Sequence, residues 1–165
     1  MILAAIDGRS AAGKSTLADQ LVRDQGAVVF HMDDYFLPRD KRQPGIAGNM
    51  DLMRFRKEVL EPLCQGRAAV TRRFDCSVQQ LGPEERTEPA DLVIVEGAYS
   101  LHPLLRDFYD FRVFMDVDPV RQKERILQRG GPEKARQFQE IWIPREEAYL
   151  EACHVKEQCD MILET

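Results

Sequence analysis

The segment GRSAAGKS, from Gly8 to Ser15, constrains the fold of this chain more than any other part of the sequence. It fits the spacing GxxxxGK[ST] and directly follows the apolar stretch MILAAID. Its two glycines permit backbone dihedral angles and close approaches that side chains would block. The backbone N–H groups of such a loop point inward, and the following helix directs the positive end of its dipole to the same place. The sequence therefore predicts a strand, a phosphate-binding loop and a helix, in that order.

The residues of this loop have expected parts in nucleotide binding. Lys14 can reach the terminal phosphates, and the hydroxyl group of Ser15 can hold Mg²⁺. The alternative is a glycine turn that matches the spacing by chance, but a strand before the loop and a helix after it argue against that. The residues expected to contact the nucleotide are Gly8, Arg9, Ser10, Ala11, Ala12, Gly13, Lys14, Ser15 and Thr16.

Five short apolar runs are continuous rather than alternating, which is typical of strands that are covered on both faces. They alternate with segments of helical character, which favours a three-layer α/β fold with a central five-stranded parallel sheet. Ligands bind at the carboxyl ends of the strands in such sheets. The runs are Ile2–Ile6, Val28–Met32, Leu92–Val95, Val113–Val117 and Met161–Leu163. Helices are expected at Ser15–Asp24, Leu52–Leu63, Pro119–Gln128, Pro132–Ile141 and Pro144–Val155, and a short hairpin within Gln65–Pro89.

Length and charge narrow the class of protein. A chain of 165 residues fits one domain. A net charge of −5 gives no electrostatic footprint for nucleic acid or for an anionic membrane surface. The first residues lack the basic start of a signal peptide, so we expect a cytoplasmic protein with neither nucleic acid nor membrane as a partner. The four cysteines form no CxxC pair and are expected to be free thiols.

Acidic residues follow two of the expected strands. The segment HMDDYFLP places Asp33 and Asp34 after the second strand, and VIVEGAY places Glu96 after the third. Glu96 could hold Mg²⁺, in part through water. The alternative for Glu96 is a carboxylate that is satisfied by backbone groups at the end of its strand.

Three arginines are spaced four residues apart in RQKERILQR and share one helical face: Arg121, Arg125 and Arg129. Three stacked cations repel one another unless they meet anions. The alternative is a solvated basic face on which Glu124 pairs locally. The pair Gly130-Gly131 follows directly and would provide a hinge.

Together these motifs resemble the uridine kinase-like family of P-loop small-molecule kinases, which is related to nicotinamide riboside kinases, pantothenate kinases and phosphoribulokinases. The resemblance rests on IDGRSAAGKSTLA, DDYF, NMD, VEG, the arginine helix and IWIPREEAYLEA, and it is loosest across Cys76–Pro89. It implies the P-loop NTPase fold as a single domain over residues 1–165, with a helical lid at about 119–142. The implied cofactors are ATP and Mg²⁺.

The resemblance also implies roles for particular residues. In the family, an Asp that opens a DSFY-like motif lies beside the acceptor hydroxyl and the metal. Asp33 takes that position, and Asp34, the alternative catalytic residue, stands where the motif has serine. The arginine helix belongs to the lid over the phosphates. The expected catalytic residues are Asp33, Lys14 and Arg125, the further nucleotide contacts are Arg121 and Arg129, and the metal ligands are Ser15, Asp33 and Glu96.

The acceptor pocket is less well defined, because the chain is short across Cys76–Pro89, where the family builds part of its nucleoside pocket. The resemblance implies transfer of the ATP γ-phosphate to a hydroxyl of a small metabolite, first of all the 5′-hydroxyl of a nucleoside such as uridine or cytidine. The alternatives are nicotinamide riboside, pantothenate or a sugar phosphate as acceptor, or a nucleotide-binding regulator without an acceptor. Candidate acceptor contacts are Asp33, Tyr35, Phe36, Asp51, Arg72, Asp75 and Tyr99, although Phe36 could equally be a core residue.

Overall fold

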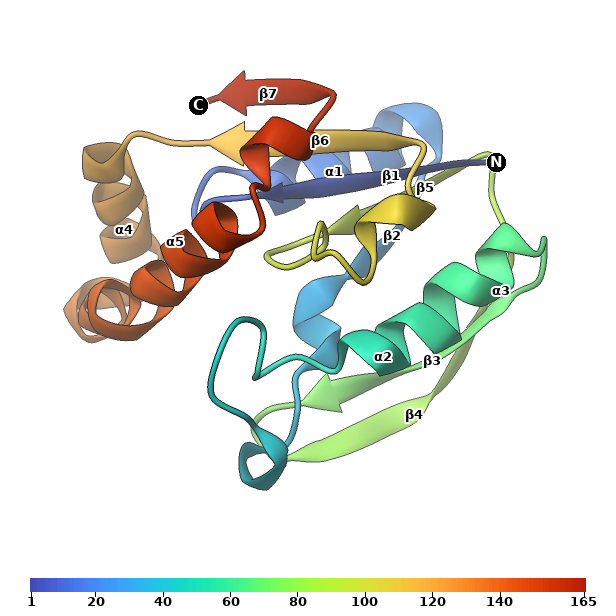
Figure 1. Ribbon diagram of the computed structural model, residues 1–165, viewed down its shortest axis with the longest axis horizontal. Coiled ribbons are helices and arrows are strands. Elements are labelled where there is room, and N and C mark those ends of the chain that lie inside the picture. Colours follow the sequence, from blue (N-terminus) through green and yellow to red (C-terminus); the bar gives the residue numbers. More distant parts are fainter.

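The computed structural model describes residues 1–165 and has the predicted five-stranded parallel sheet (Figure 1). The strand order is β2-β5-β1-β6-β7, and every neighbouring pair is parallel. Each predicted apolar run is a strand, with small shifts at its ends. The strands are β1 (Ile2–Gly8), β2 (Val28–His31), β5 (Leu92–Glu96), β6 (Phe111–Asp116) and β7 (Met161–Glu164).

Alternate residues of β1 face two separate cores, and this gives the predicted three layers. Ala4 and Ile6 pack in a core of nine buried residues that includes Ala18 of helix α1 (Lys14–Gln25). Leu3 and Ala5 face the larger core of 23 buried residues. That core is covered by the helical run of α2 (Leu52–Phe55) and α3 (Glu61–Cys64) and by helix α5 (Ile143–Ala152). Strands β1, β5 and β6 therefore lie between helices, as their unbroken apolar runs predicted, whereas the edge strand β7 is largely exposed.

Two of the helical runs contain a π-helical turn shortly before an internal proline. The turn Arg56–Leu60 precedes Pro62 and joins α2 to α3, as the predicted continuous helix requires. The turn Phe138–Trp142 precedes Pro144 and joins helix α4 (Pro119–Gln137) to α5. Because proline has no N–H group and crowds the preceding turn, a widened turn lets the helix continue. The predicted separation between the last two helices is therefore wrong.

The predicted break at Gly130-Gly131 is confirmed. Gly131 has φ 74° and ψ 178°, a backbone conformation that is available almost only to glycine, and it kinks α4. The first part of α4 follows the carboxyl end of β6, and after the kink the chain continues through the π-helical turn into α5, which runs back toward the sheet (Figure 1).

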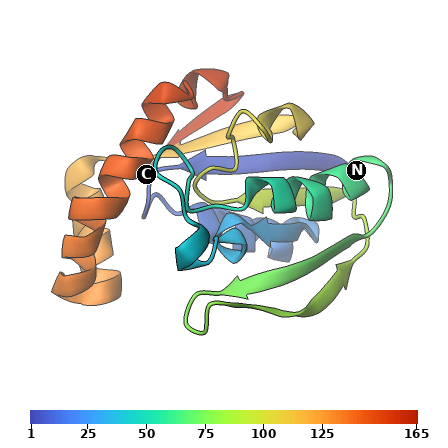
Figure 2. The same cartoon turned by 60° about the horizontal axis from the view of Figure 1, so that its bottom comes forward.

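The predicted hairpin is also confirmed. Strands β3 (Ala69–Asp75) and β4 (Gln80–Thr87) pair antiparallel as a separate two-stranded sheet that lies beside α2 and α3, apart from the central sheet (Figure 2). Ala69, Thr71 and Phe74 are buried on its inner face, whereas β4 is almost wholly exposed. All four cysteines are free thiols. No helix combines the length and the apolar character that a membrane span requires.

Candidate functional site

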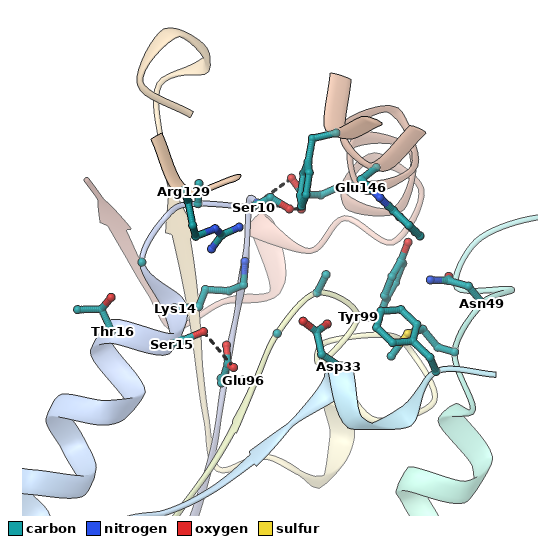
Figure 3. Close-up of a pocket in the computed structure, with 18 residues that line it drawn as sticks. Ser10, Lys14, Ser15, Thr16, Asp33, Asn49, Glu96, Tyr99, Arg129 and Glu146 are labelled. Carbon is teal, nitrogen blue, oxygen red and sulfur yellow. Dashed lines mark hydrogen bonds between the residues drawn. The ribbon is translucent and has the colours of Figure 1, made fainter. Parts of the chain in front are cut away.

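A pocket of about 270 Å³ lies at the carboxyl ends of β1, β2 and β5 (Figure 3). The glycine loop forms one wall, and residues from the segment predicted to be a lid, Arg129, Phe138 and Trp142, also line the pocket. The structure brings together a large part of the site that was predicted from the sequence. The predicted residues that line the pocket are Ser10, Ala11, Gly13, Lys14, Ser15, Thr16, Asp33, Phe36, Glu96, Tyr99 and Arg129.

The loop conformation depends on its first glycine. Gly8 has φ 133°, and a Cβ atom built there would lie 2.0 Å from the carbonyl oxygen of Met115 on β6. Any side chain at this position would therefore separate the loop from the sheet. The loop ends at Gly13, with φ 94°, and α1 begins at the next residue.

The loop is built to receive an anion. The first backbone bond of α1 runs from the N–H group of Leu17 to the carbonyl of Gly13, at 3.0 Å. The N–H groups of the residues in between bond to no other group of the chain, as at the start of any helix. The ammonium group of Lys14 donates to the carbonyl oxygens of Gly8 and Arg9, at 2.8 and 2.9 Å. Free N–H groups, a lysine and the helix dipole thus converge on one side of the pocket.

Carboxylates face these positive groups. Ser15 donates from its hydroxyl to Oε1 of Glu96, at 3.2 Å, and Glu96 is buried at the end of β5. The carboxylate of Asp33 points into the same pocket (Figure 3). Burial raises the pKa of Asp33, and the charge of Glu96 raises it further, while Lys14 opposes the shift. Asp34 instead points to Arg73 of the hairpin, with 3.7 Å between the charged groups.

The oxygen atoms of Ser15, Asp33 and Glu96 are of the type that Mg²⁺ prefers. No three carboxylate, imidazole or thiol groups converge tightly enough to enclose a cation by themselves. Mg²⁺ commonly keeps several waters and is bound by one or two carboxylates together with phosphate oxygens, so this donor set suits it when a nucleotide is present.

His31, which sequence reasoning left unassigned, belongs to this cluster. Its Nδ1 atom lies 2.6 Å from Oε1 of Glu96, and this hydrogen bond raises the pKa of the imidazole. The two residues end neighbouring strands and are direct partners in the register of β2 and β5. The sequence shows that both residues end strands, but it does not show that the two strands are neighbours.

The three arginines predicted to act together have separate surroundings. Arg129 lines the pocket. Arg125 donates to the carbonyl oxygen of Ala11, at 3.1 Å, and to the hydroxyl of Thr165, at 2.9 Å, outside the pocket lining. Arg121 lies in another hollow, beside Arg9 and Asp118.

Some predicted nucleotide and acceptor contacts have local structural roles instead. Arg9 pairs with Asp116 and Glu147, away from the pocket lining, and Ala12 is buried in the core beneath the loop. Tyr35 packs edge-on against Phe55, with 4.8 Å between the ring centroids. The other three are polar residues that stabilise a helix start or the hairpin: Asp51 caps α2, Arg72 donates to the carbonyl of Gly82, and Asp75 accepts from the N–H of Ser77.

Besides Glu146, six pocket residues were not among the predicted site residues: Asn49, Met50, Gly97, Ala98, Phe138 and Trp142. Asn49 and Met50 are buried just before Asp51, the N-cap of α2, and Phe138 and Trp142 come from the π-helical turn after α4. Trp142 is part of the pocket wall, and the guanidinium group of Arg145 lies 5.6 Å from the centroid of its ring. The two aromatic residues are four positions apart, at the first and last positions of a turn that the sequence did not predict to be π-helical.

Glu146, at the start of α5, is another residue that sequence reasoning missed. Its carboxylate accepts from the N–H group and the hydroxyl of Ser10, and it is buried. Burial raises its pKa, while Lys14 and the bonds from Ser10 oppose the shift. One turn further along, Tyr149 donates to the buried carboxylate of Asp7, at 2.6 Å. Helix α5 is thus attached to the end of β1 and to the loop.

Comparison with known proteins identifies relatives in sequence, although no family model matches the chain. A phosphoribulokinase from Synechocystis sp. is 29% identical over 86% of this chain and 45% of that protein. Uridine kinase-like protein 5 from Arabidopsis thaliana is 27% identical over 82% of this chain and 32% of that protein. A uridine kinase from Lactobacillus johnsonii is 28% identical over 85% of this chain and 72% of that protein. The chain thus spans less than half the length of the first two relatives.

Solved structures with the same fold include three kinases or possible kinases. A possible uridine kinase from Bacillus stearothermophilus has a TM-score of 0.74 and 24% identity, and the match covers 98% of this chain and 88% of that one. A phosphoribulokinase from Rhodobacter spheroides has a TM-score of 0.67 at 16% identity, with 99% and 69% covered. D-glycerate 3-kinase from Cryptococcus neoformans var. grubii has a TM-score of 0.65 at 18% identity, with 92% and 80% covered.

Proposed function

We propose that this chain, a relative of the uridine kinases and phosphoribulokinases that shares the fold of the P-loop kinases, is an ATP-dependent phosphotransferase that acts on a hydroxyl group of a small metabolite. One observation carries the proposal: Lys14 and the free N–H groups of the loop face the same pocket as the carboxylate of Asp33. A phosphate held by the loop and an acceptor hydroxyl beside Asp33 would then lie next to each other, which is the positioning that phosphoryl transfer requires.

The residues of the chain have separate parts in this reaction. The loop N–H groups and Lys14 bind the phosphates and stabilise negative charge during transfer. Arg129 adds a second cation from the lid side. Mg²⁺, which Ser15 and Glu96 would hold, supplies positive charge at the phosphates when it is bound. Asp33 accepts a hydrogen bond from the acceptor hydroxyl and takes its proton late in the transfer, and its raised pKa makes it a better base than an ordinary aspartate.

For the acceptor we propose a nucleoside or a similar molecule without negative charge. The pocket beyond Asp33 has aromatic side chains, Phe36, Tyr99 and Trp142, on which a base could stack, and the amide of Asn49 to bond its polar edge. Lys14 and Arg129 are the basic residues in the pocket lining, and both lie on the phosphate side (Figure 3). An anionic acceptor would therefore meet Asp33 and Glu96 without a nearby cation of its own.

The acceptor proposal is tested by following ADP release with ATP and Mg²⁺ and a panel of alcohols. Uridine, cytidine and nicotinamide riboside are the nucleosides, and pantothenate, D-glycerate and ribulose 5-phosphate are the anionic acceptors. We expect turnover with at least one nucleoside and background rates with the anions. Turnover with an anion alone would refute the nucleoside proposal, and ATP binding without turnover of any acceptor would favour a regulator.

The different surroundings of the arginines predict different effects of their removal. Arg129→Ala should lower kcat more than it weakens ATP binding, because a charge beside the transferred phosphate is needed most in the transition state. Arg125→Ala should mainly weaken ATP binding, since Arg125 supports the loop through Ala11 and not through the pocket. Steady-state kinetics with ATP varied at a saturating acceptor separate the two. Equal effects on kcat would contradict this assignment.

A further inference from the structure

Helix α5 is bonded to the first half of the phosphate loop by adjacent carboxylates. Arg9 donates from its guanidinium to both carboxylate oxygens of Glu147, at 2.7 and 2.9 Å. Ser10 donates from its N–H group to both oxygens of Glu146, at 2.9 and 2.8 Å, and from its hydroxyl at 2.6 Å. These partners are 136 and 138 residues apart in the chain. The loop therefore depends on a distant helix for its position.

Every polar group of Ser10 has a partner inside the protein. Its N–H and hydroxyl groups are bonded to Glu146, and its carbonyl accepts from the side-chain amide of Gln122 on α4, at 3.1 Å. Gln122 also lies 3.4 Å from Oε1 of Glu146. Glu146 and Gln122 are only 4% and 3% exposed, so water does not compete for these bonds. The N–H group of Ser10 is thus bonded within the protein and is not available to a phosphate. The N–H groups of the loop that are free to bind a phosphate come after Ser10 in the chain.

Gln122 lies near the start of the predicted lid, residues 119–142, and Glu146 lies just after its end. Gln122 is in α4 before the kink at Gly131, and Glu146 is in the first turn of α5, after the π-helical turn. Both are bonded to the same loop residue, Ser10. The two ends of the lid are therefore held at the loop, whereas the segment between them has a glycine hinge. The position of Arg129, just before the hinge, relative to Lys14 in the loop therefore depends on these hydrogen bonds.

We propose that Glu146 is a positioning residue for nucleotide binding: through Ser10 it holds the phosphate loop against both ends of the lid. Glu146 does not have to touch the substrate for this. Its carboxylate keeps the loop in the conformation in which the N–H groups after Ser10 and the ammonium of Lys14 face the same phosphates. The inference rests on the proposed function, since it takes ATP to be the ligand of the loop.

The test compares Glu146→Ala and Glu146→Gln in the full chain by calorimetric ATP binding and by steady-state kinetics. Loss of the hydrogen bonds in Glu146→Ala should weaken ATP binding and raise its KM by about tenfold or more, with kcat at saturating ATP changed by less than about threefold. Glu146→Gln should stay within about threefold of the wild type, because its amide oxygen still accepts from the N–H of Ser10. Glu151→Ala is the matched control, since it removes an exposed carboxylate from the same helix.

The outcomes separate this inference from the proposed function. Should Glu146→Ala fold poorly, Gln122→Ala replaces it, because it removes the other bond to Ser10 and should also raise the KM for ATP. Unchanged ATP affinity in Glu146→Ala, or in Gln122→Ala, would overturn the positioning role. Tighter ATP binding in both Glu146 variants would also overturn it, because the carboxylate would then be a competitor of the phosphates. A wild-type chain that does not bind ATP would instead refute the proposed function.

Discussion

Lys14→Ala is expected to lower kcat by at least about a hundredfold, the scale on which removal of one preorganised positive or donor group from a transition state acts. In the structure the ammonium group lies across the loop and is bonded to the carbonyls of Gly8 and Arg9, so it is already in place before a phosphate arrives. A preorganised cation needs little rearrangement when negative charge develops on the transferred group. The measurement is ADP release at saturating ATP and acceptor.

The fold should survive this substitution. Lys14 is the first residue of α1, where a cation is unfavourable for the helix dipole, and alanine is a good helix former. We expect an unchanged circular dichroism spectrum and a melting temperature equal to or above that of the wild type. Lys123→Ala, which removes an exposed lysine from α4, is the control and should retain activity. Near-normal ATP-dependent turnover in Lys14→Ala would refute the role of the loop.

Asp33→Asn is expected to lower kcat by about a hundredfold or more, the scale of general-base catalysis. The substitution keeps the size of the side chain and removes its ability to take a proton. Asp34→Asn is the matched control, because it changes the neighbouring residue in the same way. Asp34 faces Arg73 across 3.7 Å at a partly exposed position, so its loss should cost little activity. The reverse ranking of the two variants would move the catalytic role to Asp34.

Asp33→Asn is expected to raise the stability of the folded chain although it lowers kcat. Burial and the charge of Glu96 raise the pKa of Asp33, so the ionised carboxylate is less favourable in the folded chain than in the unfolded one. The folded state therefore binds the proton more tightly, and its stability falls as the pH rises from the ordinary aspartate pKa through the raised one. Asp33→Asn lacks this loss. Denaturant unfolding at pH 4 and pH 8 should show a gain in stability for the variant that is larger at pH 8.

The sequence by itself determined the parts of this protein that depend on local backbone chemistry. The loop needs φ values of 133° and 94°, which glycine adopts readily and other residues rarely do, and the sequence has glycine at both positions, Gly8 and Gly13. Continuous apolar runs indicated the five strands, because a strand that is buried on both faces needs apolar residues at every position, although the edge strand β7 is largely exposed. The break at Gly131 was equally local. The reactive residues at strand ends, Asp33 and Glu96, followed from these elements.

The tertiary structure alone determined which residues these side chains contact. His31 meets Glu96 because β2 and β5 are neighbours in the sheet, and Ser10 meets Glu146 because the chain returns to the loop after the lid. Arg72 and Asp75, which are polar and lie near an expected pocket in the sequence, remain exposed in a hairpin that stands apart from the central sheet. The physical reason is that backbone conformation is set by neighbours in the chain, whereas strand order and helix docking are set by which apolar faces bury each other. A pattern of residue types therefore indicates the backbone conformation but does not determine the strand order or the docking of the helices.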